Sequence, residues 1–208
     1  MLDQKYKRYH LMSPVKFRED WTHSFPEIIP VTFLFRSELP SRWFRVHSLP
    51  DSKRYAEDEL EWQILLMRHN DILDDLFEMG EDLYLVAASY EHDECEELHP
   101  FKEVQSLKSL NMIPFETIDL NRIDPECWDI GSRLVPMVTV LSWEKEKFNE
   151  IIMDVANDNS RVFFFSPTKN RIVAPYDGGI DIILEDEKAK DFYRSKYHHW
   201  TPMNDAGL

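Results

Sequence analysis

The sequence predicts an α+β fold, in which a mostly antiparallel sheet with a C-terminal three-strand meander is flanked by helices. Two observations support this prediction. Apolar runs at 162–166, 171–176 and 180–184 follow one another with only tight turns between them, which favours antiparallel neighbours over crossover connections. Amphipathic patterns at 58–79 and 185–197 predict helices that pack against the sheet.

The N-terminal part of the chain predicts a short helix followed by two strands. A Ser-Pro pair at 13–14 is typical of a helix start, and Phe17 and Trp21 lie four residues apart on one face of that helix. Aromatic and β-branched residues at 31–36 and 43–48 predict two strands.

The strongest helix pattern runs from Asp58 to Met79. Asp58 and Glu61 form a capping pair at its start, and Gly80 stands where a left-handed residue would end it. The apolar face, spaced by three and four residues, consists of Trp62, Leu65, Leu66, His69, Ile72, Leu73 and Leu76. These apolar residues are expected to be buried.

The middle of the chain has weaker patterns. We expect a buried strand at 83–90, an acidic loop at 91–99, a helix at 101–110, irregular structure at 111–133 and a strand at 136–143. Trp143 then leads into a helix. The apolar stripe of this helix consists of Phe148, Ile151, Ile152 and Val155.

The turn at 177–179 is Asp-Gly-Gly, a strong hairpin pattern. We expect a positive φ at Gly178 or Gly179, because the tightest hairpin turns require one. The length of 208 residues fits a single domain, 1–208, with two packed lobes, 1–99 and 111–208, as the alternative.

Composition excludes several function classes. The net charge of −15 argues against a general nucleic-acid binder. The spacing of the five glycines excludes phosphate-cradling loops and the nucleophile elbow, and we predict no catalytic residue, cofactor or metal site. The two cysteines form no C-x-x-C pair, no apolar stretch is long enough for a bilayer and no leader is evident, so we expect a cytoplasmic protein without membrane partners.

Acidic charge is concentrated in one segment. Residues 56–103 contain 16 acids and two bases, a net of −14. This segment is either a solvated surface or a recognition face that steers a basic partner. The candidate partner-binding residues are Asp71, Asp74, Asp75, Glu78, Glu91, Asp93, Glu94, Glu96 and Glu97.

Positive charge precedes the acidic segment. Residues 36–55 hold five bases and two acids, a net of +3. Guanidinium and ammonium groups in the 45–55 loop are suited to a phosphate or carboxylate ligand. The bases could equally pair with neighbouring acids. The candidate anion-binding residues are Arg45, His47, Ser52, Lys53, Arg54, Tyr55 and Asp177.

Two blocks of the sequence resemble a known group of proteins. R-V-H-S-L-P-D-S-K-R-Y at 45–55, with L-L-M-R-H-N-D-I-L after it, forms one block, and V-A-P-Y-D-G-G-I-D-I-I-L at 173–184 forms the other, followed by Y-x₂-W. The chain is similar to bacterial cytoplasmic proteins of a domain-of-unknown-function family, some of them immunity-like. The resemblance implies no catalytic residue.

We therefore expect a non-enzymatic acidic binding protein, most concretely an immunity protein that neutralises a basic toxin or another basic protein. The alternative is a small-anion or phosphate-ligand binding protein or a hydrolase that uses the 45–55 loop. In that case Asp177 or His47 would transfer a proton.

Overall fold

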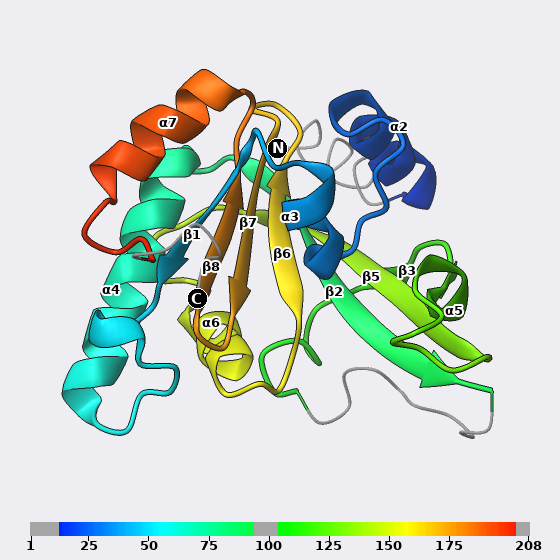
Figure 1. Cartoon of the computed structure of the whole chain (residues 1–208), viewed down its shortest axis with the longest axis horizontal. Coiled ribbons are helices and arrows are strands. Elements are labelled where there is room, and N and C mark those ends of the chain that lie inside the picture. The colour runs from blue at the N-terminus through cyan, green and yellow to red at the C-terminus, as the bar shows by residue number, and fades with distance from the viewer. Residues whose placement is uncertain (1–12, 94–103, 203–208) are drawn as a thin grey trace, which may run out of the picture.

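The computed structural model describes residues 13–93 and 104–202, and these ranges are built around one antiparallel sheet of eight strands (Figure 1). Its strand order is β1-β8-β7-β6-β2-β5-β3, and β4 also pairs with β5. The α+β class and the β6–β8 meander are confirmed. The strands are β1 (Trp43–His47), β2 (Asp82–His92), β3 (Ile113–Pro114), β4 (Ile118–Asp119), β5 (Ser132–Ser142), β6 (Val162–Ser166), β7 (Arg171–Tyr176) and β8 (Gly179–Ile183).

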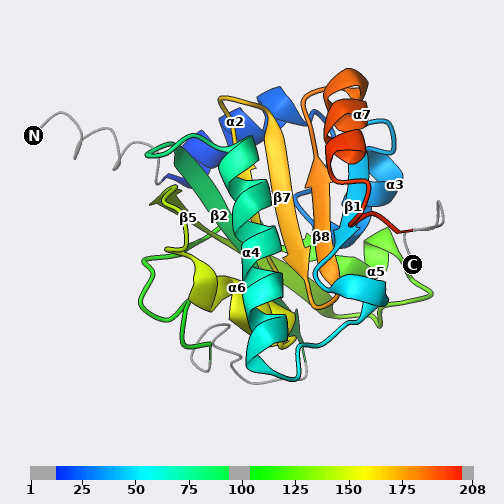
Figure 2. The same cartoon turned by 90° about the vertical axis from the view of Figure 1, so that its left-hand side faces the viewer.

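Helices cover both faces of this sheet (Figures 1 and 2). They are α2 (Pro14–Ser24), α3 (Phe35–Glu38), α4 (Glu59–Leu76), α5 (Leu120–Ile123), α6 (Asn149–Ala156) and α7 (Glu187–Lys196), with 3-10 turns η1 (Thr32–Leu34) and η2 (Pro50–Ser52). Side chains alternate along β2, so Leu83 and Leu85 pack in the core under α4 and α6, whereas Tyr84 and Val86 pack under α2 and α3. Within the described ranges no helix is both long enough and apolar enough to cross a membrane.

The long helix α4 follows the predicted pattern at its start and stops early at its end. The Asp58 side chain accepts the Glu61 N–H at 2.9 Å. Leu65, Ile72, Leu73 and Leu76 are fully buried, and Trp62 and Leu66 are partly buried against the same core. Gly80 has the predicted left-handed conformation, with φ 81°, but it does not cap α4, because Phe77 is already extended. Gly80 lies in the turn that follows the helix and donates its N–H to the backbone oxygen of Trp143.

The β7–β8 hairpin is present, but the predicted backbone conformation of its turn is wrong. Tyr176 pairs with Gly179, and neither glycine of the turn has a positive φ. Glycine is needed here for a different reason. A Cβ on Gly179 would lie 2.2 Å from the Val46 backbone oxygen, because β1 passes directly beside the turn.

Two predicted elements are replaced by helical turns. The predicted strand at 31–36 is wrong, because that segment forms η1 and the start of α3, which turns Phe35 into the core against Trp21. A short aromatic run suits a buried helix as well as a strand. The helix predicted at 101–110 is also wrong over 104–110, which form turns, and its first residues lie outside the described ranges.

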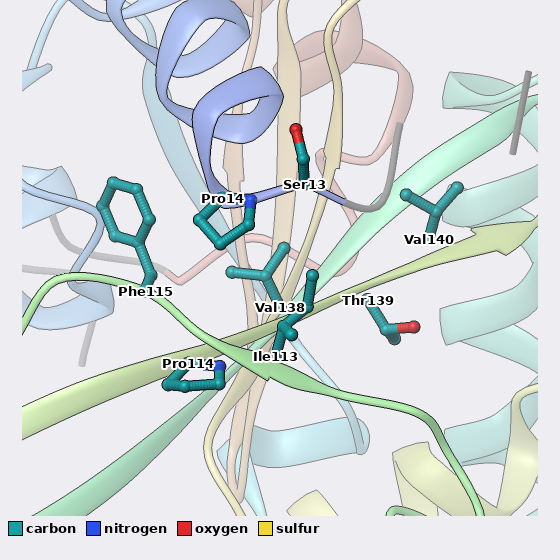
Figure 3. A pocket seen from close by; sticks show the side chains of 8 residues that line it. All are labelled: Ser13, Pro14, Ile113, Pro114, Phe115, Val138, Thr139 and Val140. Atoms are coloured by element: carbon teal, nitrogen blue, oxygen red, sulfur yellow. The ribbon is translucent and has the colours of Figure 1, made fainter. Parts of the chain in front are cut away.

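The region between β2 and β6 is more regular than predicted. Residues 111–133 contain β3, β4 and α5, all of which contact β5. Strand β5 begins at Ser132 rather than 136, and the helix expected after Trp143 starts only at Asn149. Figure 3 shows Ser13 and Pro14, where α2 begins, over β3 and the middle of β5, and the space that these residues line has no room for a ligand.

Strands from the two predicted lobes alternate within the sheet. β1 and β2 come from residues 1–99, yet β8, β7 and β6 lie between them. Of the predicted acidic loop at 91–99, Glu91 and His92 belong to β2, and residues 94–99 lie outside the described ranges.

Candidate functional site

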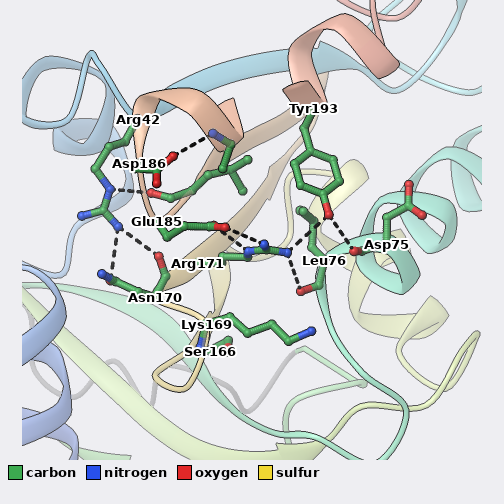
Figure 4. A network of polar contacts seen from close by, with 12 residues as sticks. Arg42, Asp75, Leu76, Ser166, Lys169, Asn170, Arg171, Glu185, Asp186 and Tyr193 are labelled. Atoms are coloured by element: carbon green, nitrogen blue, oxygen red, sulfur yellow. Dashed lines mark hydrogen bonds and ion pairs between the residues drawn. The ribbon is translucent and has the colours of Figure 1, made fainter. Parts of the chain in front are cut away.

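A partly buried arginine on β7, Arg171, fixes the end of α4 against α7 (Figure 4). Arg171 donates to both carboxylate oxygens of Glu185 at 2.7 Å and to the backbone oxygen of Leu76 at 3.3 Å. It also contacts the hydroxyl of Tyr193, which donates to the backbone oxygen of Asp75 at 3.2 Å. This network holds the last turn of α4 and the C-terminal segment in a defined relative position.

Between α4 and the chain that follows α7 lies a cleft of about 420 Å³. We call it the acidic–aromatic cleft. Three of the predicted partner-binding acids line it on one side, and aromatic residues line the other. The lining residues are Asp71, Asp74, Asp75, Lys196, Tyr197, His199 and Trp200.

Asp75 joins the two sides of the cleft. Its carboxylate accepts hydrogen bonds from the Tyr197 hydroxyl and the Lys196 ammonium. Burial and the neighbouring Asp75 raise the pKa of Tyr197, so the phenol stays protonated and acts as a donor. The Lys196 ammonium also lies 5.6 Å from the Tyr197 ring centroid. The chain's own lysine thus shows that this carboxylate–aromatic pair accommodates a cation.

Asp74, next to Asp75, and Asp71, one turn earlier on α4, share a single cation. The Lys145 ammonium lies 3.2 Å from Asp74 and 3.7 Å from Asp71, and its hydrogen bond to Asp74 raises its pKa. Asp74 also accepts the indole N–H of Trp143 at 3.3 Å. Three carboxylates thus face two ammonium groups, Lys145 and Lys196, which leaves these five groups with a net charge of −1.

Trp200 closes the aromatic side. Its ring stacks on Tyr197 at 5.2 Å, and the Arg68 guanidinium lies 5.2 Å from its centroid. The backbone oxygen of Trp200 accepts the N–H of His47, and Arg68 donates to the oxygen of His47 at 2.8 Å. These contacts fix the indole beside the carboxylates of α4. Burial lowers the pKa of Arg68.

The other predicted acids lie elsewhere. Glu78 pairs with Lys169 at 3.0 Å just beyond α4. Glu91 lies near the far end of β2, and Asp93 follows the strand and pairs with Arg133 at 2.5 Å. Glu94, Glu96 and Glu97 lie outside the described ranges. The acidic segment is therefore divided between α4 and the far end of β2, which lie at opposite sides of the molecule in Figure 1.

The predicted anion-binding loop packs on the β7–β8 hairpin. Arg45 forms a two-pronged ion pair with Asp181, at 2.7 and 2.9 Å. The Nε of Arg54 donates to Asp177 at 2.6 Å, and the Tyr55 hydroxyl donates to the same carboxylate at 3.0 Å. The structure thus brings both resemblance blocks together, with carboxylates already bound to both guanidinium groups.

The remaining members of that set are also engaged. Lys53 contacts both oxygens of Glu61 at 2.7 Å, and Ser52 is hydrogen-bonded to the His47 ring at 2.9 Å. Burial, followed by the charges of Arg45 and Arg68, lowers the pKa of His47.

The aromatic half of the cleft was missed by sequence reasoning. Tyr197 and Trp200 form the Y-x₂-W pattern of the resemblance, but nothing in the pattern indicates that it faces α4. Lys145 and Lys196 likewise gave no signal, because isolated lysines are ordinary surface residues.

Fold and site together define an α+β protein with a single antiparallel sheet and an acidic–aromatic cleft at one side. The chain belongs to the family described as "Domain of unknown function (DUF3885)", whose model matches residues 31–205. The match includes the cleft and both resemblance blocks. No curated protein and no solved structure shows a significant match to the chain.

Proposed function

We propose that this protein is a non-enzymatic binding protein whose acidic–aromatic cleft receives a cationic side chain of a basic protein partner. The observation that carries the proposal is the pairing of three α4 carboxylates with Tyr197 and Trp200 in one cleft. Carboxylates attract a cation, and aromatic walls both exclude water and interact favourably with its charge. Lys196 already places an ammonium group on Asp75 and near Tyr197.

An organic cation suits this cleft better than a metal ion. Among the described residues, no group of three or more His, Cys, Asp or Glu side chains is arranged to hold a metal. Small-anion binding at the 45–55 loop has less support, because Arg45 and Arg54 are each balanced by one carboxylate, Asp181 and Asp177, whereas the cleft carboxylates outnumber their ammonium partners.

The most specific form of the proposal is an immunity protein of a bacterial cytoplasm that covers the basic active cleft of a toxin. The acidic charge of residues 56–103 supports a basic partner, and a toxin is the kind of basic partner that the sequence resemblance implies. Affinity capture from the organism that encodes the chain, followed by mass spectrometry, tests this form directly. Recovery of a partner without a basic surface would contradict it.

The cleft itself can be tested without the partner. The probe is a capped hexa-arginine peptide, and its neutral control carries citrulline, which has nearly the same shape, at every position. Proton–nitrogen spectra would follow the indole N–H of Trp200, identified with Trp200→Phe. We expect a saturable shift with the arginine peptide that weakens as salt rises, and a much smaller one with citrulline.

Matched variants separate the cleft from general acidity. Asp71→Asn with Asp74→Asn removes two of the three carboxylates and should weaken binding by about tenfold or more. Glu187→Gln removes one exposed acid of α7 and should leave the affinity within about twofold. Equal binding of both peptides, or equal affinity of the double variant and the wild type, would overturn the proposed function.

A further inference from the structure

A second exposed surface combines aromatic rings with acidic charge, at the far end of the β2–β5 ribbon. Strand β6 pairs with β2 only over Tyr84–Ala87, so the last part of β2 extends beyond it with β5 and α5 (Figure 1). Three rings stack there in a row. Trp128 lies between Tyr90, at 5.6 Å and 11°, and Phe33, at 6.3 Å and 30°.

This aromatic stack, Phe33–Trp128–Tyr90, is open to solvent. Phe33 is 44% exposed and Tyr90 is 37% exposed. Ile130, two residues after Trp128, is 85% exposed, the highest value among the large hydrophobic residues of the described ranges. Solvent-exposed aromatic residues with an apolar neighbour are the composition of an interaction hot spot. Beneath them a small core of Val31, Leu120 and Leu134 holds the stack rigid.

The charge around the stack selects the partner. Residues 116–131 carry five acids and one base, and Arg18 of α2 pairs with Glu116, which leaves a net charge of −3. Glu126 and Asp129 flank Trp128 in the sequence and are both exposed. Arg161, which is close enough to Tyr90 to influence its pKa, is neutralised by its ion pair with Asp158. A second copy of this acidic chain would bring like charges together here, whereas a cationic segment would meet opposite charge.

We propose that the aromatic stack binds an arginine-bearing segment of the basic partner, as a second contact surface separate from the acidic–aromatic cleft. This inference rests on the proposed function, because it assigns a further contact to the same class of partner. Arginine is the specific choice since its planar guanidinium stacks on aromatic rings while its N–H groups bind carboxylates. The exposed outer rings, Phe33 and Tyr90, would stack on the guanidinium, and Glu126 and Asp129 would bind its N–H groups.

The six tryptophans of the chain allow both surfaces to be followed in one titration. The indole N–H of Trp128 reports the stack and that of Trp200 reports the cleft, each identified by a Trp→Phe variant. The probes are again hexa-arginine and its citrulline analogue. We expect saturable shifts of Trp128 with the arginine peptide only. Glu126→Gln with Asp129→Asn should weaken the affinity read at Trp128 about fivefold or more and leave the Trp200 response unchanged.

A second variant tests the rings rather than the charge. Phe33→Ser removes an exposed ring from the end of the stack and should weaken the peptide affinity measured at Trp128 about threefold or more. Ile130→Ser removes the exposed apolar neighbour and should weaken the same affinity less. Unchanged affinity in both the charge variant and Phe33→Ser would overturn the inference.

The two proposals fail in different ways. A Trp200 shift without any Trp128 shift would overturn the aromatic-stack proposal and leave the proposed function standing. A Trp128 shift without a Trp200 shift would overturn the cleft and support the stack. A Trp128 signal that moves with protein concentration in the absence of peptide would identify a second copy as the occupant and overturn the choice of a cationic partner.

Discussion

His69 should make the stability of this protein depend on pH between neutrality and pH 5. The imidazole is fully enclosed on α4, and its Nδ1–H donates to the Leu65 oxygen at 2.8 Å. Burial lowers its pKa to about 4, with a further contribution from the charge of Arg68. In the unfolded chain the pKa is about 6.5, so as the pH falls the unfolded state binds the proton first.

The magnitude follows from the two pKa values. The stabilising contribution is complete above about pH 6.5 and is lost progressively as the pH falls toward 4. At pH 5, about 1.5 units below the unfolded pKa and 1 unit above the folded one, the loss amounts to roughly 2 kcal/mol. The measurement is urea unfolding, followed by tryptophan fluorescence, at pH 7.5 and pH 5.

Two variants isolate this contribution from other titrating groups. His69→Gln keeps a donor for the Leu65 oxygen but has no titrating ring. Between pH 7.5 and pH 5 its free energy of unfolding should therefore fall by about 2 kcal/mol less than that of the wild type. His198→Gln changes an exposed imidazole and should follow the wild type. If His69→Gln loses as much stability as the wild type between the two pH values, the buried neutral His69 is not the cause.

Three further substitutions test the scaffold by urea or thermal unfolding. Leu73→Ala, at a position with 1% exposure, should cost roughly 2–5 kcal/mol, and a cost below about 1 kcal/mol would contradict its place in the core. Gly179→Ala should destabilise strongly, because its Cβ would meet the Val46 oxygen at 2.2 Å. Gly178→Ala, whose Cβ would meet side-chain atoms alone, the nearest a Tyr176 ring carbon at 3.1 Å, should be much milder, and equal effects would refute the close approach of β1 as the cause. Asp181→Asn removes the carboxylate that binds the partly buried Arg45 guanidinium with both oxygens and should cost on the order of 3 kcal/mol; a neutral outcome would mean that the pair is not structural.

The parts of the fold that the sequence predicts well are those with a local repeating pattern. The apolar stripe of α4 and the runs of β6, β7 and β8 contain enough residues to distinguish a period of 3.6 from a period of 2. Residues 31–36 are too few for that distinction. Their helical conformation depends on Phe35 packing under Trp21, a tertiary contact that no local pattern contains.

The candidate site was half predictable for the same reason. Charge density along the chain identifies Asp71, Asp74 and Asp75, because those residues are close together in sequence. Tyr197 and Trp200 reach them only through the packing of the C-terminal segment against α4 and β1. The pairing of Arg45 with Asp181 has the same character, since each residue alone resembles a free surface charge.

The strand order has a consequence for how the chain can fold during synthesis. β1 is synthesised early, but it lies at the edge of the sheet and pairs with β8, where Trp43 is opposite Ile183. On the ribosome, β1 must therefore wait until β8 has emerged before it can be paired. Such long-range pairing slows folding and leaves an aggregation-prone intermediate exposed. Loss of the C-terminal residues from β8 onward should thus leave β1 unpaired and the nascent chain dependent on chaperones.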